Sequence, residues 1–183
     1  MDERVGRAAR SFLHIGRVLM AKGKGGRPGG TVAAVEALVS PVVEELGLRV
    51  WDVRFEKEGP DWFLRVYIDR DEPLDMNTCE AATRAIDPVL DAADPIQQSY
   101  FLEVGSPGLG RKLTRDAHFE ILRGRKIGAH LIRPDAAGAR DVCGTLLGKE
   151  GTDVLLERGD GTRFTVAEKD TSYFKLCDDE DLF

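Results

Sequence analysis

A glycine-rich segment followed by three cations holds the residue types best suited to binding a charged ligand. Residues 105–110 read Gly-Ser-Pro-Gly-Leu-Gly, and Arg111, Lys112 and Arg115 come directly after them. Because residues 100–104 are a candidate strand, this stretch has to be considered as a phosphate-binding loop. Exposed backbone N–H groups, together with guanidinium and ammonium groups, would form a cradle for RNA backbone phosphates.

The spacing within this segment does not fit a nucleotide-hydrolysing loop of the Walker type. Such a loop needs a lysine directly after its last glycine, and then a Ser or Thr that holds Mg²⁺. Here Arg111 follows Gly110, and Leu113 follows Lys112. The simpler interpretation is an interdomain turn, in which proline fixes one backbone dihedral angle and glycine permits another.

The predicted contacts with RNA include a second basic run, at residues 123–126. A solvated charged surface is the usual explanation of such a run, but here it extends the basic patch of the glycine-rich segment. The predicted RNA contacts are Ser106, Gly108, Arg111, Lys112, Arg115, Arg123, Arg125 and Lys126. The predicted hinge residues are Gly105, Pro107 and Gly110.

Catalysis and metal binding have weaker support in the sequence. No Ser, His and acidic residues fall in a recognisable catalytic arrangement, so no catalytic residue is assigned. Three cysteines and three histidines are scattered without any CxxC spacing, so neither a metal nor a cofactor is expected. The cysteines are interpreted as reduced, buried, small apolar side chains. The alternative function is an enzyme that acts on a phosphorylated ligand at residues 105–110.

Charge is distributed unevenly along the 183 residues, whose net charge is −6. Residues 1–30 carry seven Lys or Arg against two acids, residues 31–107 carry six against sixteen, and residues 108–183 carry thirteen against fourteen. This pattern excludes a general nucleic-acid coat and favours selectivity for one site on a large ribonucleoprotein. No apolar run approaches the ~18 residues that a membrane span needs, so no membrane partner is expected.

Residues 1–30 are predicted to be a basic, flexible N-terminal extension. Its apolar residues are spaced by three or four, which predicts one side of a helix made of Val5, Ala8, Phe12, Ile15 and Leu19. Residues 22–30 have the composition of a flexible linker. Two alternatives are a basic amphipathic helix on a membrane surface and a true start at Met20.

Residues 31–107 are predicted to form an α/β domain with the order helix, strand, strand, helix, strand. The first helix would begin at Thr31 as its N-cap and end at Gly47, with a kink or break at Pro41. Residues 51–55 and 64–68 alternate apolar and polar side chains, which predicts a hairpin with one buried face.

The rest of this domain is a second helix and a third strand. The helix is marked by apolar residues from Cys79 to Leu90, with an interruption near Pro88, and would end at Asp94-Pro95, while the strand would cover residues 100–104. A small sheet with its helices against one face is the economical way to pack these elements, so the fold class is α+β.

Residues 108–177 are predicted to form a small barrel of SH3-like or Sm-like kind, preceded by a short helix at 114–122. Turn signals such as Asp160-Gly161 separate five strand candidates: 125–132, 140–148, 153–158, 162–167 and 173–177. Residues 178–183 are an acidic tail.

The hinge segment resembles RimP, a family of bacterial ribosome maturation factors whose hallmark has the form Leu-Glu-Val-Ser-Ser-Pro-Gly-Leu-Asp-Arg-Pro-Leu. The matching residues are Leu102, Glu103, Val104, Ser106, Pro107, Gly108, Leu109, Arg111 and Leu113. The departures are Gly105, Gly110 and Lys112, and the last two make the loop more basic. Further matching residues are Leu74-Asp75, Cys79, Arg84, Leu90-Asp91, Asp94-Pro95-Ile96, His118-Phe119 and Gly124-Arg125.

The resemblance spans about residues 31–177 and implies a fold and a function. It implies a KH-like N-terminal α/β domain followed by a small barrel, in a cytoplasmic, non-enzymatic factor. The implied partners are the immature small ribosomal subunit, its rRNA and small-subunit ribosomal protein twelve, the last contacted mainly through the barrel. We expect a monomer without a cofactor.

Overall fold

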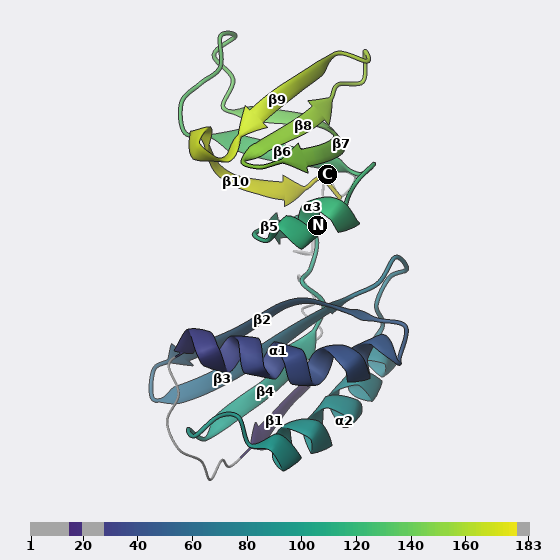
Figure 1. The fold of residues 1–183 in the computed structure, drawn as a ribbon, viewed down its shortest axis with the longest axis vertical. Coiled ribbons are helices and arrows are strands. Elements are labelled where there is room, and N and C mark those ends of the chain that lie inside the picture. Colours follow the sequence, from purple (N-terminus) through teal and green to yellow (C-terminus); the bar gives the residue numbers. More distant parts are fainter. Residues whose placement is uncertain (1–14, 20–27, 179–183) are drawn as a thin grey trace, which may run out of the picture. The chain divides into compact units, whose positions relative to one another are not determined.

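Two separate sheets organise the chain, each in its own compact unit. A computed structural model describes residues 15–19 and 28–178, with no side-chain description for 15–19, 28 and 29. The first unit ends at Pro107 and the second begins at Gly108 (Figure 1). The architecture is α+β, as the sequence predicts.

The first unit contains a four-stranded sheet in the order β1-β4-β3-β2. Its strands are β1 (Ile15–Leu19), β2 (Arg49–Glu58), β3 (Asp61–Asp69) and β4 (Tyr100–Gly105). The strands β2 and β3 form the predicted hairpin, while β3 and β4 run parallel, with Leu64 opposite Leu102. Such a parallel pair needs a crossover connection, which the helix α2 (Met76–Ala93) supplies.

Helices α1 (Pro28–Glu44) and α2 bury one face of this sheet. Figure 1 shows α1 lying across the strands. The side chains shared between helices and sheet are apolar and almost completely buried: Val35, Val39, Val43, Cys79, Ala82, Ile86, Leu90, Leu64, Val66, Ile68, Leu102 and Val104. The period-two alternation of β3 therefore sends Phe63, Arg65 and Tyr67 to the opposite face.

Capping by side chain and backbone fixes the ends of α2. The carboxylate of Asp75 accepts a hydrogen bond from the backbone N–H of Thr78 at 2.7 Å. At the other end Asp94 has a φ of 42°, a left-handed conformation that ends the helix. No break occurs at either proline, since Pro41 and Pro88 lie inside continuous helices, so the predicted interruption near Pro88 and the break considered at Pro41 are wrong. Burial of the flanking side chains outweighs the lost hydrogen bond at each proline.

The N-terminal prediction also needs correction. Residues 15–19 form the strand β1, which pairs antiparallel with β4 from Ile15 opposite Val104 to Leu19 opposite Tyr100. A helix and a flexible extension were expected there, but the free hydrogen-bonding edge of β4 outweighs the helical spacing of a few apolar residues. Likewise α1 begins at Pro28, within the expected linker and before Thr31. The other residues of the extension, 1–14 and 20–27, lie outside the described residues.

The second unit is a six-stranded antiparallel sheet with the order β5-β10-β6-β7-β8-β9. Its elements are β5 (Lys112–Leu113), α3 (Asp116–Ile121), β6 (Lys126–Leu131), β7 (Asp141–Glu150), β8 (Asp153–Glu157), β9 (Arg163–Ala167), a 3₁₀ turn (Glu168–Asp170) and β10 (Thr171–Leu176). Five of these strands lie at the predicted segments between turn signals, and the two-residue β5 was missed. The rings of Phe119 and Phe174 meet edge to face at 5.4 Å in its core.

Candidate nucleic-acid interface

Alternation along β10 and β6 gives the second unit an apolar inner face and a polar outer face. Along β10, Phe174 and Leu176 are buried, while Lys175 between them is half-buried. Along β6, Ile127 is buried and the neighbouring Lys126 is exposed. Since facing residues of antiparallel strands share a side, the strand register decides which polar residues gather on the outer face.

The register brings three lysines to this outer face. Lys112 of β5 lies opposite Lys175 of β10, and Lys175 in turn lies opposite Gly128 of β6. Lys126 is two residues before Gly128 on the same strand, so it points to the same side. We call Lys112, Lys126 and Lys175, with the aromatic residues described next, the lysine face.

Two stacked rings continue the lysine face along the same strands. Tyr173 and His130 lie opposite each other in register, and their rings stack at 5.2 Å with planes 5° apart. The ammonium group of Lys112 lies 4.7 Å from the centre of the Tyr173 ring. A carboxylate oxygen of Asp141 lies 2.8 Å from Nδ1 of His130 and orients the imidazole. Cations interleaved with aromatic rings are the combination that binds single-stranded RNA by phosphate contact and stacking.

The floor of the lysine face is Gly128, which has no side chain. A Cβ placed there would lie 3.9 Å from Cγ of Lys175 and still closer to two cysteine sulfurs. The aliphatic stem of Lys175 therefore lies next to the glycine. The sulfurs belong to Cys143, which is exposed, and Cys177, which is half-buried, so their interpretation as buried apolar side chains is wrong, while Cys79 is buried as expected.

Arg111 and Lys112 point to opposite faces of their strand. The carbonyl of Arg111 accepts a hydrogen bond from the N–H of Leu176, whose side chain is buried on the inner face. The Nε of Arg111 is itself enclosed. Arg115 is half-buried at the start of α3. Of the three cations after the glycine-rich segment, only Lys112 thus joins the lysine face.

The basic residues of the run at 123–126 do not all lie on the lysine face. Arg123 pairs with Glu120 at 3.0 Å, and its guanidinium group lies against Gly148 of β7. Arg125 is exposed just before β6, and its carbonyl accepts a hydrogen bond from Leu146. Lys126 alone is on the outer side of β6 beside Gly128. The structure therefore brings together Lys112 and Lys126 among the predicted contacts.

The glycine-rich segment has a backbone that requires glycine at two positions, and one of its amides already has an anionic partner. Gly108 and Gly110 have φ values of 81° and 62°, which side chains larger than glycine rarely adopt. The N–H of Gly110 donates to a carboxylate oxygen of Asp178 at 2.7 Å. A phosphate would have to displace that carboxylate to use this amide. Ser106 is half-buried, and its backbone N–H lowers the pKa of the Cys79 thiol, although burial raises that pKa by more.

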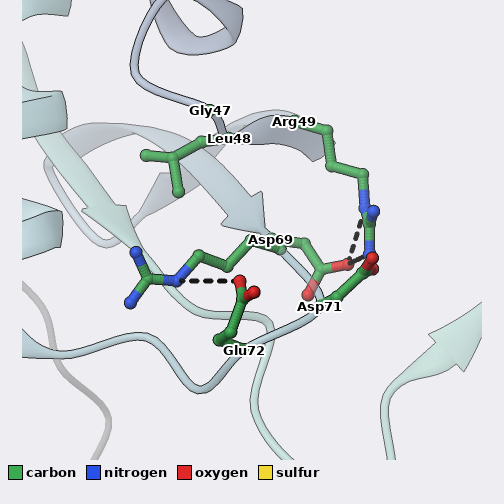
Figure 2. A pocket seen from close by; sticks show the side chains of 7 residues that line it. Gly47, Leu48, Arg49, Asp69, Asp71 and Glu72 are labelled. Carbon is green, nitrogen blue, oxygen red and sulfur yellow. Dashed lines mark hydrogen bonds and ion pairs between the residues drawn. The ribbon is translucent and has the colours of Figure 1, made fainter.

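A polar pocket in the first unit is a neutralised ion-pair cluster (Figure 2). The guanidinium group of Arg49 lies 2.8 Å from Asp69 and 2.9 Å from Asp71. Burial lowers the pKa of Arg49, but hydrogen bonds and the charges of Asp71 and Asp69 outweigh burial and raise it overall. Arg70 faces Glu72 across 3.9 Å. Because each cation has a carboxylate beside it, this pocket is a poor phosphate site.

Comparison with known families identifies the first unit. Residues 38–110 match the family model described as the RimP N-terminal domain. The chain contains a RimP N-terminal domain. The match runs from α1 through β4 into the glycine-rich segment, and it confirms the resemblance to the RimP family of ribosome maturation factors. Apart from residues 108–110, the second unit, which carries the lysine face, lies beyond the matched residues. No helix in the described part of the chain is long and apolar enough to cross a membrane.

Sequence reasoning missed three of the five residues on the lysine face. Lys175, Tyr173 and His130 stand far from the glycine-rich segment in sequence. The segment 173–177 was predicted only as a strand, without a statement of which of its side chains share a face. The sequence does not show that β10 pairs with β5 and β6, because the order in which strands pair is set by the tertiary fold.

Proposed function

We propose that this protein is a non-enzymatic, cytoplasmic factor that binds the immature small ribosomal subunit and assists its assembly. The match of residues 38–110 to the RimP N-terminal domain carries this proposal. In it, the first unit is a KH-like domain and the second a small barrel of SH3-like or Sm-like kind. The protein acts as a monomer.

The lysine face is the surface proposed to contact the small-subunit rRNA. Three ammonium groups and a stacked pair of rings would engage phosphates and an unpaired base. The predicted contact with ribosomal protein twelve belongs to the same unit in this proposal. Ser106, Gly108, Arg111, Arg115, Arg123 and Arg125 flank the rRNA contact or support its backbone rather than forming its centre.

Sedimentation of cell lysate through a density gradient tests the proposed function. The protein should travel with free small subunits and be absent from complete ribosomes, because an assembly factor leaves before the subunits join. Equal recovery with complete ribosomes, or recovery only at the top of the gradient, would contradict the proposal.

Alanine variants test the lysine face. The triple variant Lys112→Ala, Lys126→Ala and Lys175→Ala should bind purified immature subunits more weakly. Each phosphate contact contributes roughly 0.7 to 0.9 to the slope of log affinity against log salt, so the slope should fall by about 2 to 3. Lys169→Ala is the matched control, since Lys169 is exposed in the same unit but lies in the 3₁₀ turn. Equal binding by the triple variant and this control would show that the rRNA contact does not lie on the lysine face.

Arg111 and Lys112 are expected to respond differently although they are adjacent. Arg111→Ala should lower the free energy of unfolding by about 1 to 2 kcal/mol, because it removes a half-buried side chain. Lys112→Ala should leave stability within about 0.5 kcal/mol of wild type and weaken subunit binding. Chemical denaturation and subunit binding are measured on both variants. If Arg111→Ala weakens subunit binding but leaves the free energy of unfolding unchanged, the glycine-rich segment is the RNA contact after all.

A further inference from the structure

Asp178, the first residue of the acidic tail, already fills an anion-binding position of the second unit. Its carboxylate accepts the hydrogen bond of the Gly110 N–H at 2.7 Å, and its side chain is half-buried there. Backbone N–H groups are among the donors that proteins use to hold nucleic-acid phosphates. The carboxylate of Asp178 thus occupies the position that a phosphate oxygen would take on this amide.

Hydrogen bonds at the end of β10 place the start of the tail beside the lysine face. The N–H of Leu176 donates to the carbonyl of Arg111 at 2.9 Å, and the N–H of Cys177 donates to the carbonyl of Lys126 at 3.0 Å. The strand therefore ends between β5 and β6, which carry Lys112 and Lys126. Asp178 is the next residue of the chain.

The charges of the tail and of the lysine face are complementary. Residues 178–181 read Asp-Asp-Glu-Asp, and the lysine face contributes three ammonium groups. Residues 179–181 lie outside the described residues, but an extended chain advances at most ~3.6 Å per residue, which keeps them within roughly 11 Å of Asp178. A short tether of this kind gives an effective concentration on the order of millimolar.

The tail can imitate the phosphates of RNA but not its bases. Carboxylates form ion pairs with ammonium groups, as phosphates do, whereas Asp and Glu have no ring to stack on Tyr173 and His130. An RNA that offers phosphates alone therefore competes with the tail for the same contacts. An RNA that also stacks an unpaired base gains a contact that the tail cannot replace.

We propose that residues 178–181 are a tethered competitor of RNA at the lysine face. This inference rests on the proposed contact of the lysine face with rRNA. The tail weakens binding to RNA in general, and the rRNA site displaces it because that site adds base stacking to its phosphate contacts. The tail thus makes the lysine face selective for its proper site.

Binding of a short, labelled oligouridylate tests the competition. At low salt, a chain that ends at Cys177 should bind this RNA at least about fivefold more tightly than the full chain, the lower end of typical couplings between two ligands. The difference should disappear as salt rises, because the Debye length falls from about 10 Å at 0.1 M to about 3 Å at 1 M. Equal affinities of the two chains at low salt would overturn the inference.

Two full-length variants separate the charge of the tail from its other effects. The neutral-tail variant has Asn or Gln at all four positions of 178–181, so it keeps a carbonyl oxygen for the Gly110 amide and should bind RNA as tightly as the shortened chain. The matched control is Glu150→Gln with Asp153→Asn, which neutralises two exposed acids where β7 turns into β8. The control should bind as the wild-type chain does. Equal gains in the control and the neutral-tail variant would contradict a local competitor.

A measurement without RNA detects the tail on the lysine face directly. Carboxylates beside an ammonium group favour its protonated form, which does not react with acylating reagents. Lys112 and Lys126 should therefore be acylated faster in the shortened chain, while Lys169 should not change, as read by mass spectrometry. Unchanged rates at Lys112 and Lys126 would overturn the proposal.

The two readouts also distinguish this inference from the proposed function. If both chains bind oligouridylate equally and the triple lysine variant binds it more weakly, the lysine face is an RNA contact and only the competition is wrong. If neither chain binds oligouridylate, although tail removal speeds acylation, the RNA contact of the lysine face has failed and the competition fails with it.

Discussion

Arg65 is the side chain that organises the charged face of the first sheet. Its Nε donates to Glu103 at 2.7 Å, and its Nη1 lies 2.6 Å from Glu58 and 3.1 Å from Glu56. Arg54 stands opposite Arg65 in the β2–β3 register, but its guanidinium group turns away to Asp52. Two like charges thus stay separated, because each has carboxylates of its own.

Replacing Arg65 with Met should destabilise the protein by about 1 to 3 kcal/mol. The variant would lose several charged hydrogen bonds and leave three carboxylates without their shared cation. Arg65→Lys should recover only part of the loss, because one ammonium group cannot reach three acids as a planar guanidinium can. Urea unfolding at neutral pH measures the difference. A change below about 0.5 kcal/mol would show that solvent already screens these pairs.

Acid should remove part of the same stabilisation. The hydrogen bond from Arg65 lowers the pKa of Glu58, and the charge of Arg65 acts in the same direction, while desolvation opposes both. A carboxyl whose pKa is lower in the folded chain stabilises it above the unfolded pKa, about 4.3, and this contribution disappears as the pH falls through the folded value. Wild type should therefore lose more stability on acidification than Arg65→Met does, and parallel pH profiles would contradict the assignment.

The place of a single residue on a surface could be predicted from the sequence only where its neighbouring residues in the fold could be predicted too. Lys112 and Lys126 were singled out for their charge, and they do share a face. Arg111 was grouped with Lys112 because they are adjacent, but in a strand neighbouring side chains point to opposite faces. The approach of Cys143 to Cys177 showed no sequence signal, because their 34-residue separation has meaning only once β6 lies between β7 and β10.

At the scale of elements, β1 closes one edge of the first sheet. It pairs with β4 over five positions, from Ile15 to Leu19. Without it, β4 would be an edge strand with unpaired backbone groups, which favours association between chains. A chain that starts at Met20 would lack this strand.

Removing residues 1–19 should therefore destabilise the first unit, by on the order of 2 kcal/mol, because several backbone hydrogen bonds of about 0.5 to 1.5 kcal/mol each are lost. The amide protons of residues 100–104 should exchange faster with solvent, while those of β2 and β3 should change little. Hydrogen exchange read by mass spectrometry makes this comparison. Unchanged protection of β4 would show that β1 contributes nothing to the sheet in solution.

Strands were easier to predict than the ends of helices and the outermost strands. The hairpin of β2 and β3 follows from alternation of apolar and polar side chains, which constrains both period and face, and the five other strands of the second unit were placed between turn signals. The two-residue β5 is too short to give such a signal, and the apolar residues around β1 have helical spacing instead. The effect of the prolines at 41 and 88 was overestimated. A proline inside a helix costs a few kcal/mol, but burying a whole helix face contributes a larger stabilising free energy.

At the scale of the molecule, the chain has two apolar cores. The core cluster around Val39, Leu64 and Ile86 contains residues of the first unit only. The second unit has its own, with Phe119 against Phe174. A unit with its own core can fold alone, and a connection such as residues 105–110 permits relative motion unless a large apolar interface prevents it.

We expect residues 1–107 and 108–183 to fold as separate fragments. Each should unfold cooperatively in urea, and the midpoint of each should lie close to one of two transitions of the whole chain. The fragment of residues 31–107, which omits β1 and the first turn of α1, is the matched comparison and should be less stable than 1–107. The 108–183 fragment should keep the lysine face and retain part of the affinity for the immature small subunit. A molten 1–107 fragment, or a single transition of the whole chain far above both fragments, would show that the two units stabilise each other.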